Sequence, residues 1–351
     1  MDSILLRLQN LIKIPSYSRE ENETADFLEQ DLRSRGIGVE RISNNILARN
    51  KYWKEEAPVL ILNSHHDTVK PASSYTRDPF DPSVEAGKVY GLGSNDAGGA
   101  LCCLIETFID YYEEQSLPFN LMLIASAEEE ISGPGGIQSV LQNIATPWGA
   151  IVGEPTRMQA AVAERGLMVV DGTAVGKAGH AARLEGKNAL YIACDDIDII
   201  RNLTFDRRSK YLPDTQAVVT QINAGSQHNV IPDRCTFVID VRVNERYSNQ
   251  EVFQLLDEAT SSKLEARSYR LNSSFLPEDH LLTRVIDDLG LHKFGSPTLS
   301  DQALMPFPSL KIGPGDSARS HTADEYIEIA ELEEGYKTYK KIIESLINHM
   351  E

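Results

Sequence analysis

The chain has 351 residues, of which 41% are hydrophobic and 25% are charged, and its formal net charge is −18. This length predicts two domains, and the acidic balance, without a basic cluster, argues against nucleic acid and membrane surfaces as partners. The chain shows no signal-peptide pattern, no CxxC pair among its four cysteines, and no run near the roughly 18 apolar residues that span a bilayer. We therefore expect a cytoplasmic protein.

Apolar residues at helical spacing predict a first amphipathic helix over residues 4–12, ending before Pro15. Ser18 and Glu21 resemble a capping box that opens a second helix. Strands and helices then alternate up to about residue 160. This order predicts an α/β domain with a mostly parallel sheet covered by helices.

The pattern changes after about Ala163. One strand, one helix, two strands and another helix make up most of a βαββαβ unit, which predicts an inserted, ferredoxin-like α+β domain over residues 164–269. Alternation of helix and strand then returns and ends in a helix over residues 331–348. Residues 1–163 and 270–351 are thus expected to form one split domain.

Acidic residues and histidines follow three apolar, strand-like runs. Because open α/β sheets carry their chemistry at the carboxyl ends of strands, we expect these side chains to converge. The candidates are His65 and Asp67 after the run 59–62, Asp96 after Gly91-x-Gly93, Glu128, Glu129 and Glu130 after 121–125, Glu154 after 150–152, and His321. Together they predict a two-metal hydrolase site.

The spacing of these residues indicates roles. His65 and Asp67 lie two positions apart and face the same way on an extended chain, so His65 can bind a metal while Asp67 fixes its other ring N–H. His66 faces the opposite way. Adjacent carboxylates at 128–130 repel unless a cation or proton is shared, so one could bind a metal while another acts as general base. Nitrogen and oxygen donors without thiolate suit zinc, with cobalt or manganese as alternatives.

The Gly91-x-Gly93 loop has a second interpretation, a dinucleotide site. Asp96 stands where that motif has its third glycine, and its charge would repel a pyrophosphate. A loop carboxylate that bridges two cations is the better interpretation.

These motifs resemble the zinc-dependent family of acetylornithine deacetylase, succinyl-diaminopimelate desuccinylase, aminoacylase and carboxypeptidase G. Residues 64–69 match its His-x-Asp-x-Val, and residues 91–99 match its Gly-Arg-Gly-x-x-Asp-x-Lys-Gly except at Leu92 and Gly98. The family's Asp-Glu-Glu matches residues 128–130. The resemblance implies a zinc-peptidase-like domain with an inserted lid and dimerisation domain, and a homodimer.

The resemblance also implies site roles. His65, Asp96 and Glu154 would hold one metal; Asp96, Glu130 and His321 would hold the other. Asp67 would orient His65, and Glu129 would be the general base. In the inserted domain, His180 would stabilise the oxyanion in its own or the partner subunit's site. Asn229 and Arg242 would hold the substrate carboxylate, and the loop with Gly313 and Gly315 would contact substrate.

The implied reaction is hydrolysis of an N-acyl amide on an amino acid. N-acetylornithine or N-succinylornithine in arginine biosynthesis is favoured, and Arg183 or Arg319 could pair with a succinyl carboxylate. The missing basic side chains at Leu92 and Gly98 leave the substrate open. Alternatives are an N-acetyl-lysine or succinyl-diaminopimelate deacylase, a dipeptidase or carboxypeptidase, and an inactive metal-binding protein.

Overall fold

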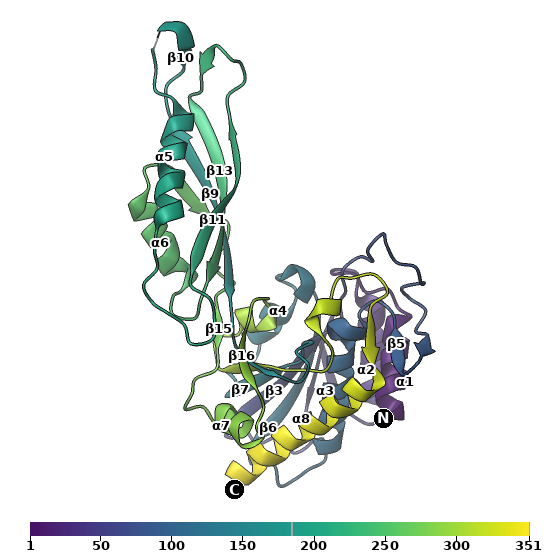
Figure 1. Cartoon of the computed structure of the whole chain (residues 1–351). Helices are drawn as coiled ribbons and strands as arrows, with labels where there is room; N and C mark the ends of the chain where they lie inside the picture. Colours follow the sequence, from purple (N-terminus) through teal and green to yellow (C-terminus); the bar gives the residue numbers. More distant parts are fainter. Residues whose placement is uncertain (184, 351) are drawn as a thin grey trace. The chain divides into compact units, whose positions relative to one another are not determined.

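The computed structural model describes residues 1–183 and 185–350 (Figure 1). The chain divides into two compact units. The larger unit comprises Met1–Val162, Phe275–Phe294 and Ser300–Glu351, and the smaller unit comprises Ala163–Ser274 and Gly295–Leu299. We infer that these units correspond to the two domains expected from the sequence.

A nine-stranded sheet organises the larger unit. Its central strands β6, β3, β7 and β17 are parallel, whereas β1 and β2 join antiparallel at one side and β8 at the other. The strands are β1 (Val39–Ile42), β2 (Asn45–Arg49), β6 (Asn120–Ser126), β3 (Val59–His65), β7 (Gly149–Val152), β17 (Ser309–Lys311), β8 (Ala160–Glu164) and β15 (Ser274–Phe275), with β16 (Lys293–Ser296) paired to β8. β6 and β7 are buried along their whole length, as expected for parallel strands covered on both faces. The mostly parallel sheet is thus confirmed.

Helices cover this sheet. The long helix α8, yellow in Figure 1, packs against α3, and α3 also contacts α1 and β3. The helices of the larger unit are α1 (Asp2–Ile12), α2 (Asn22–Ser34), α3 (Gly99–Tyr111), α4 (Ile137–Leu141), α7 (Leu281–Asp288) and α8 (Ile329–Met350). The shorter helical turns are η1 (Ser94–Gly98), η2 (Glu129–Ile131), η4 (Asp301–Leu304) and η5 (Ser317–Arg319). Both the first and the last predicted helix are present.

The capping-box prediction is wrong. Helix α2 begins at Asn22, and its N-cap residue Glu21 makes no side-chain capping bond. The Ser18 hydroxyl instead donates to the Asp67 carboxylate at 2.7 Å. The Ser18 hydroxyl, which the local motif predicts as a helix cap, therefore binds the distant Asp67 carboxylate instead.

A small three-stranded sheet brings two separate loops of the larger unit together. Its strands are β4 (Val84–Glu85), β5 (Lys88–Tyr90) and β18 (Tyr326–Glu328). Tyr326 pairs with Tyr90, so the segment before β18 lies beside the segment after β5. These segments carry His321 and Asp96.

The smaller unit has the βαββαβ order that the sequence predicts. Its antiparallel sheet has the order β11-β13-β9-β14, and buried residues of β9 and β13 pack with residues of α5 and α6 in one core. The elements are β9 (Gly166–Val175), α5 (Ala189–Asn202), β11 (Gln216–Ala224), β13 (Arg234–Val243), α6 (Asn249–Ala259) and β14 (Lys263–Ala266), with the additions β10 (Gly179–His180), η3 (Ala181–Arg183) and β12 (Val230–Ile231). The predicted inserted α+β fold is confirmed.

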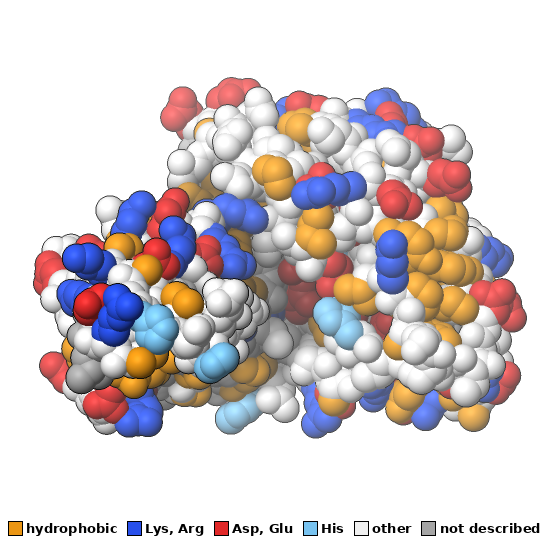
Figure 2. Space-filling view, turned by 90° about the horizontal axis from the view of Figure 1, so that it is seen from above, with side chains coloured by type: hydrophobic (Ala, Val, Ile, Leu, Met, Phe, Trp, Pro, Cys, Tyr) orange, Lys and Arg blue, Asp and Glu red, His pale blue; other side chains and the backbone are white. Residues whose placement is uncertain are grey.

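Acidic and basic side chains are interspersed over the face shown in Figure 2. Among the helices that the structure describes, none combines the length and apolar composition needed to cross a membrane.

Candidate metal centre

His65 ends strand β3 and forms the centre of a cluster of carboxylates. Its Nδ1 lies 2.9 Å from the backbone oxygen of Asp67, while its buried Nε2 has no hydrogen-bond partner. Around Nε2 lie carboxylate oxygens of Asp96 at 3.4 Å, Glu154 at 3.8 Å and Glu129 at 3.9 Å. A buried ring nitrogen without a partner is costly, and a cation held between it and the carboxylates would remove that cost.

Asp96 stands between two histidines. One of its oxygens faces His65, and the other lies 3.6 Å from Nε2 of His321. The same His321 nitrogen lies 2.9 Å from the Glu130 carboxylate. The structure therefore places Asp96 with one histidine on each side, and its role as a bridging carboxylate stays a prediction.

The donor atoms form two overlapping groups. His65, Asp96 and Glu130 offer atoms that all lie within 4.8 Å of one another, and so do His65, Glu129 and Glu154. The first group mixes residues of the two ligand sets expected from the sequence, and the second adds the expected base, Glu129. The five residues therefore form one cluster, with His321 beside it. The assignment of each residue to one metal remains a prediction.

The electrostatics of the cluster favour a cation. Burial and the charges of neighbouring carboxylates, including Asp96, raise the pKa of Glu154 to about 8. Burial likewise raises the pKa of Glu129 well above its usual value, with Glu154 and Glu130 adding to the effect. For Asp96, the contact with His65 outweighs burial and lowers the pKa. Mixed imidazole and carboxylate donors without thiolate fit zinc, cobalt or manganese, so the residues present fit the predicted metals.

The carboxylates of the cluster also shift the pKa of His321. Its hydrogen bond to Glu130 and the charges of Glu130 and Asp96 raise the pKa of His321 to about 9, against the opposing effect of burial. Its side chain is 55% exposed, whereas that of His65 is 1% exposed. The two histidines thus differ in how firmly the fold encloses them.

Asp67 lies beside His65, as its spacing predicts, but its carboxylate does more than the sequence suggested. It accepts the backbone N–H of Glu129 at 3.0 Å and of Glu130 at 3.2 Å, besides the Ser18 hydroxyl. The Nδ1–H of His65 donates to the backbone oxygen of Asp67, whereas the Asp67 carboxylate lies 3.5 Å from Nδ1. Asp67 therefore fixes the turn that presents both glutamates.

The neighbours of the cluster face elsewhere. Glu128 accepts the backbone N–H of Gly135 at 3.3 Å and lies outside both donor groups, which supports the register that takes Glu129 and Glu130 as the site residues. His66 bonds to the Thr24 hydroxyl and to the backbone oxygen of Asn44, each at 2.9 Å. The alternation along β3 thus separates His65 from His66.

Two buried carboxylates near the cluster had no place in the sequence interpretation. Glu325, 2% exposed, accepts the backbone N–H groups of the loop that ends in Asp96. Asp301, 3% exposed, accepts the Ser126 hydroxyl at 2.5 Å. Burial and the charge of Asp96 raise the pKa of Glu325 to about 8, and burial raises that of Asp301 to about 6. The available sequence signal for Glu325 is its place four residues after His321, whereas no apolar run precedes Asp301.

The glycine loop packs on the segment that carries Glu154. A side chain at Gly313 would meet the backbone oxygen of Glu154 at 2.5 Å, and Gly315 has a φ of +91°. The Gly315 oxygen also accepts the backbone N–H of Arg157 at 2.7 Å. Both positions therefore favour glycine for structural reasons, and their predicted contact with substrate stays a prediction.

The family model described as peptidase family M20/M25/M40 matches residues 61–345. The chain belongs to this family. It is a metal-dependent amidohydrolase, and the family resemblance seen in the motifs is confirmed.

Two curated relatives carry specific names. An acetylornithine deacetylase from Proteus mirabilis (strain HI4320) is 29% identical over 309 residues, which cover 82% of this chain and 79% of the relative. A succinyl-diaminopimelate desuccinylase from Cereibacter sphaeroides (strain ATCC 17025 / ATH 2.4.3) is 24% identical over 382 residues, covering 95% of this chain and 96% of the relative.

Solved structures share the fold. Aminopeptidase PepT from Bacillus cereus ATCC 10987 superposes with a TM-score of 0.77 at 19% identity, covering 98% of each chain. The YXEP protein of Bacillus subtilis, described as a dinuclear metal binding peptidase from the M20 family, gives a TM-score of 0.74 at 17% identity, covering 99% of each chain. They support the predicted α/β fold class with its inserted domain.

The remaining predicted site residues of this M20 enzyme lie in the smaller unit. His180 pairs with Val230 between β10 and β12, and the backbone oxygen of Asn229 accepts the Ala181 N–H at 3.0 Å, so His180 and Asn229 are neighbours. Arg242 lies near the end of β13, where its guanidinium bonds to Asp240 at 2.8 and 3.1 Å.

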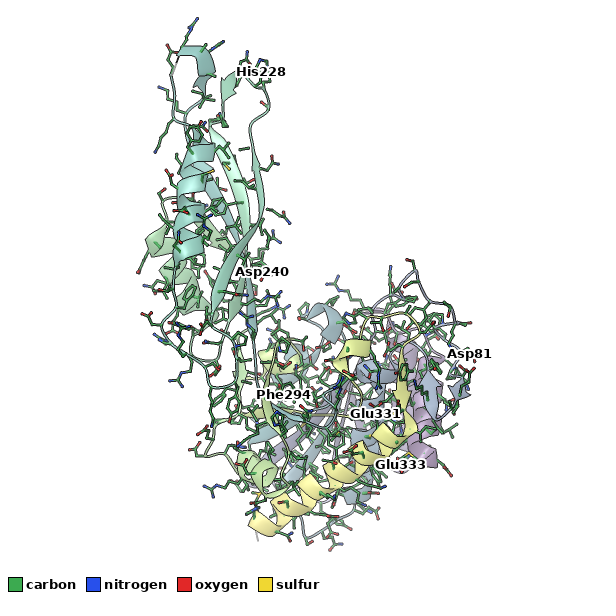
Figure 3. All side chains as sticks on the ribbon, viewed as in Figure 1. Asp81, His228, Asp240, Phe294, Glu331 and Glu333 are labelled. Carbon is green, nitrogen blue, oxygen red and sulfur yellow. The ribbon has the colours of Figure 1, made fainter. Side chains whose placement is uncertain are left out.

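Asn229 and Arg242 lie at opposite ends of the smaller unit. Asn229 lies just before Arg234, where β13 begins. Arg234 pairs with the end of β9 and Arg242 with its beginning, so eight residues of strand, roughly 26 Å, separate Arg234 from Arg242. Figure 3 labels His228, next to Asn229 in the sequence, at the tip of the smaller unit, and Asp240, two residues before Arg242, far from that tip. One chain cannot therefore place both side chains on the same carboxylate.

Proposed function

We propose that this M20 enzyme removes an acetyl or succinyl group from the amino nitrogen of an amino acid, with N-acetylornithine or N-succinylornithine of arginine biosynthesis as the foremost substrates. The position of Asp96 between His65 and His321, with the largely enclosed Glu129 side chain (13% exposed) beside them, is the observation that carries the reaction class. The deacetylase and desuccinylase names of the curated relatives support the acyl group. A cytoplasmic location remains part of the proposal.

Two zinc ions are the proposed cofactors. His65, Asp96 and Glu154 would hold one, and Asp96, Glu130 and His321 the other. When bound, two such cations act as Lewis acids and lower the pKa of the attacking water. The dinuclear metal binding named for the Bacillus subtilis relative supports this assignment.

Glu129 is the proposed general base. It lies in the cluster 3.9 Å from Nε2 of His65, and the Asp67 carboxylate holds its backbone N–H. A largely enclosed carboxylate with a raised pKa is suited to take the proton of the attacking water and to return it to the leaving amine. Asp67 acts through this hydrogen bond by fixing where the Glu129 side chain begins.

A homodimer would resolve the separation of Asn229 and Arg242. In a dimer, Asn229 and His180 of one subunit and Arg242 of the other could meet at a single substrate. His180 would then stabilise the developing oxyanion, and Asn229 and Arg242 would bind the carboxylate of the amino acid. In the single chain, the bidentate contact with Asp240 keeps the Arg242 guanidinium oriented.

A hydrolysis panel with added zinc or cobalt tests the proposed substrate. It compares N-acetylornithine, N-succinylornithine, succinyl-diaminopimelate, N-acetyl-lysine and dipeptides at one enzyme concentration. The expected result is the highest kcat/KM for an N-acyl ornithine. Cleavage of dipeptides without turnover of any N-acyl amino acid would instead favour the peptidase alternative, and silence on the whole panel would favour an inactive metal-binding protein.

A further inference from the structure

Glu325 holds the loop that presents Asp96. Its Oε1 accepts the backbone N–H of Asn95 at 2.8 Å and of Asp96 at 2.9 Å, and its Oε2 accepts that of Gly93 at 3.0 Å. Its backbone oxygen also accepts the N–H of Gly91 at 3.0 Å. One buried residue therefore makes four hydrogen bonds to a single loop.

The same residue lies four positions after His321. Pairing of β18 with β5 puts the 321–325 segment beside the loop that follows β5. His321 itself has a φ of +58° and a half-exposed side chain, and it belongs to no helix or strand. Glu325 is thus the point at which the His321 segment is joined to the Asp96 loop.

The other ligands have firmer supports. His65 ends β3 and Glu154 follows β7, and these two strands are parallel neighbours in the central sheet. Their mutual placement depends on the sheet and involves no contact with Glu325. The metal position of His65 and Glu154 therefore has two ligands that would remain in place if Glu325 were changed.

We propose that Glu325 is a positioning residue that controls occupancy of the second metal position, formed by Asp96, Glu130 and His321. It does so by holding the Asp96 loop against the segment of His321. This inference rests on the proposed two-metal site. Loss of the Glu325 carboxylate would let the two loops separate, so the second metal would lose the geometry of two of its three ligands.

Asp324 offers a matched control on the adjacent position. Its carboxylate also accepts three hydrogen bonds from one loop: the Thr76 N–H at 2.9 Å, the Thr76 hydroxyl at 2.6 Å and the Arg77 N–H at 3.0 Å. That loop contains none of the predicted metal ligands. Changing Asp324 thus removes a similar set of contacts from the same segment without touching the Asp96 loop.

The test titrates chelator-treated protein with Zn²⁺ by calorimetry and with Co²⁺ by visible absorption, for the wild type, Glu325→Gln and Asp324→Asn. The wild type and Asp324→Asn are expected to bind two ions. Glu325→Gln is expected to bind the second ion at least about 10-fold more weakly, the cost typical of losing a group that orients ligands, and to weaken the first ion less, because His65 and Glu154 stay in place. The Co²⁺ absorption bands of the second ion should also change.

Normal binding of both ions by Glu325→Gln would overturn the inference, and so would an equal loss at both positions, which indicates a general structural defect. If Glu325→Gln does not fold, Glu325→Asp decides: it keeps the charge but shortens the reach, and unchanged binding of the second ion would overturn the inference. Failure of the wild type to bind two ions would instead overturn the two-metal proposal itself.

Discussion

Nε2 of His65 is buried without a hydrogen-bond partner, 3.4 Å from Oδ1 of Asp96. Neighbouring carboxylates of Glu129 and Glu154 face the same nitrogen at 3.9 and 3.8 Å. None of these carboxylate oxygens lies close enough to Nε2 of His65 for a hydrogen bond of normal geometry. Imidazole and carboxylate donors arranged in this way fit a shared cation between them.

We expect His65→Ala to lose bound metal and His66→Gln to keep it. His65 faces the carboxylates, whereas its neighbour bonds to Thr24 and Asn44 on the other side of the strand. Metal content measured by atomic emission should fall for His65→Ala, with activity reduced more than the 10- to 100-fold typical of changes outside the ligand shell. If folded His66→Gln protein lost its metal, the assignment of His65 as the metal ligand and of His66 to the opposite side of the strand would be contradicted.

Glu129→Gln should keep its metals and lose turnover. An amide cannot take the proton of the attacking water, so kcat should fall by about 10²- to 10⁴-fold, the usual contribution of general base catalysis. Glu128→Gln is the matched control, because Glu128 is turned toward Gly135 and lies outside the cluster. Comparison of kcat at equal metal content measures the effect. A larger loss in Glu128→Gln than in Glu129→Gln would show that the register is wrong.

Much of this site follows from local patterns in the sequence. His65, Glu129 and Glu154 all stand at or just after the ends of buried strands, and apolar runs reveal such ends because parallel strands are covered on both faces. The βαββαβ unit is likewise visible because its strands alternate between buried and partly exposed residues. These features depend on neighbours along the chain.

The missed features depend on distant partners. Glu325 binds backbone N–H groups more than 200 positions away, and a backbone group leaves no signature in the sequence. Ser18 was assigned to a helix cap because Glu21 stands three positions on, yet the Asp67 carboxylate 49 positions away takes its hydroxyl. The hydrogen bond from the Ser18 hydroxyl to a charged carboxylate is stronger than a capping bond from a neutral backbone N–H to the same hydroxyl, so the long-range contact forms.

Arg319 is not expected to select a succinyl group. Both terminal nitrogens of its guanidinium bond to Glu331, at 2.7 and 3.1 Å, and it stacks on Tyr326 (Figure 3 labels Glu331 on α8). Arg319→Lys should therefore leave the ratio of kcat/KM for succinyl and acetyl substrates unchanged, while costing about 1 kcal/mol of stability through the lost bidentate pair. The substrate panel and urea unfolding measure the two effects. A drop confined to succinyl substrates would place Arg319 in the substrate site.

The metal-free protein should lose stability as the pH rises from about 5 to 9. Burial raises the pKa of Glu154 and of Glu325 to about 8, and the hydrogen bond with Glu130 raises that of His321 to about 9. All three groups bind protons more tightly in the folded state, so their stabilising contribution is complete below their unfolded pKa values and is lost as the pH rises through 8 and 9. Each of the two glutamates, which are enclosed by the fold, contributes at most about 1.4 kcal/mol per pH unit, and the more exposed His321 contributes less.

Asp67 and Asp96 have lowered pKa values, so their contribution is lost only in acid, below this range. Urea unfolding at several pH values, with chelator and with saturating zinc, measures the trend. Zinc should flatten it, because bound cations replace the protons that the carboxylates otherwise need. Glu154→Gln serves as the control: without metal it should show a shallower fall, since one titrating carboxyl has been removed. Stability of the metal-free protein that rises with pH would contradict the raised pKa values, because each of them requires the opposite sign.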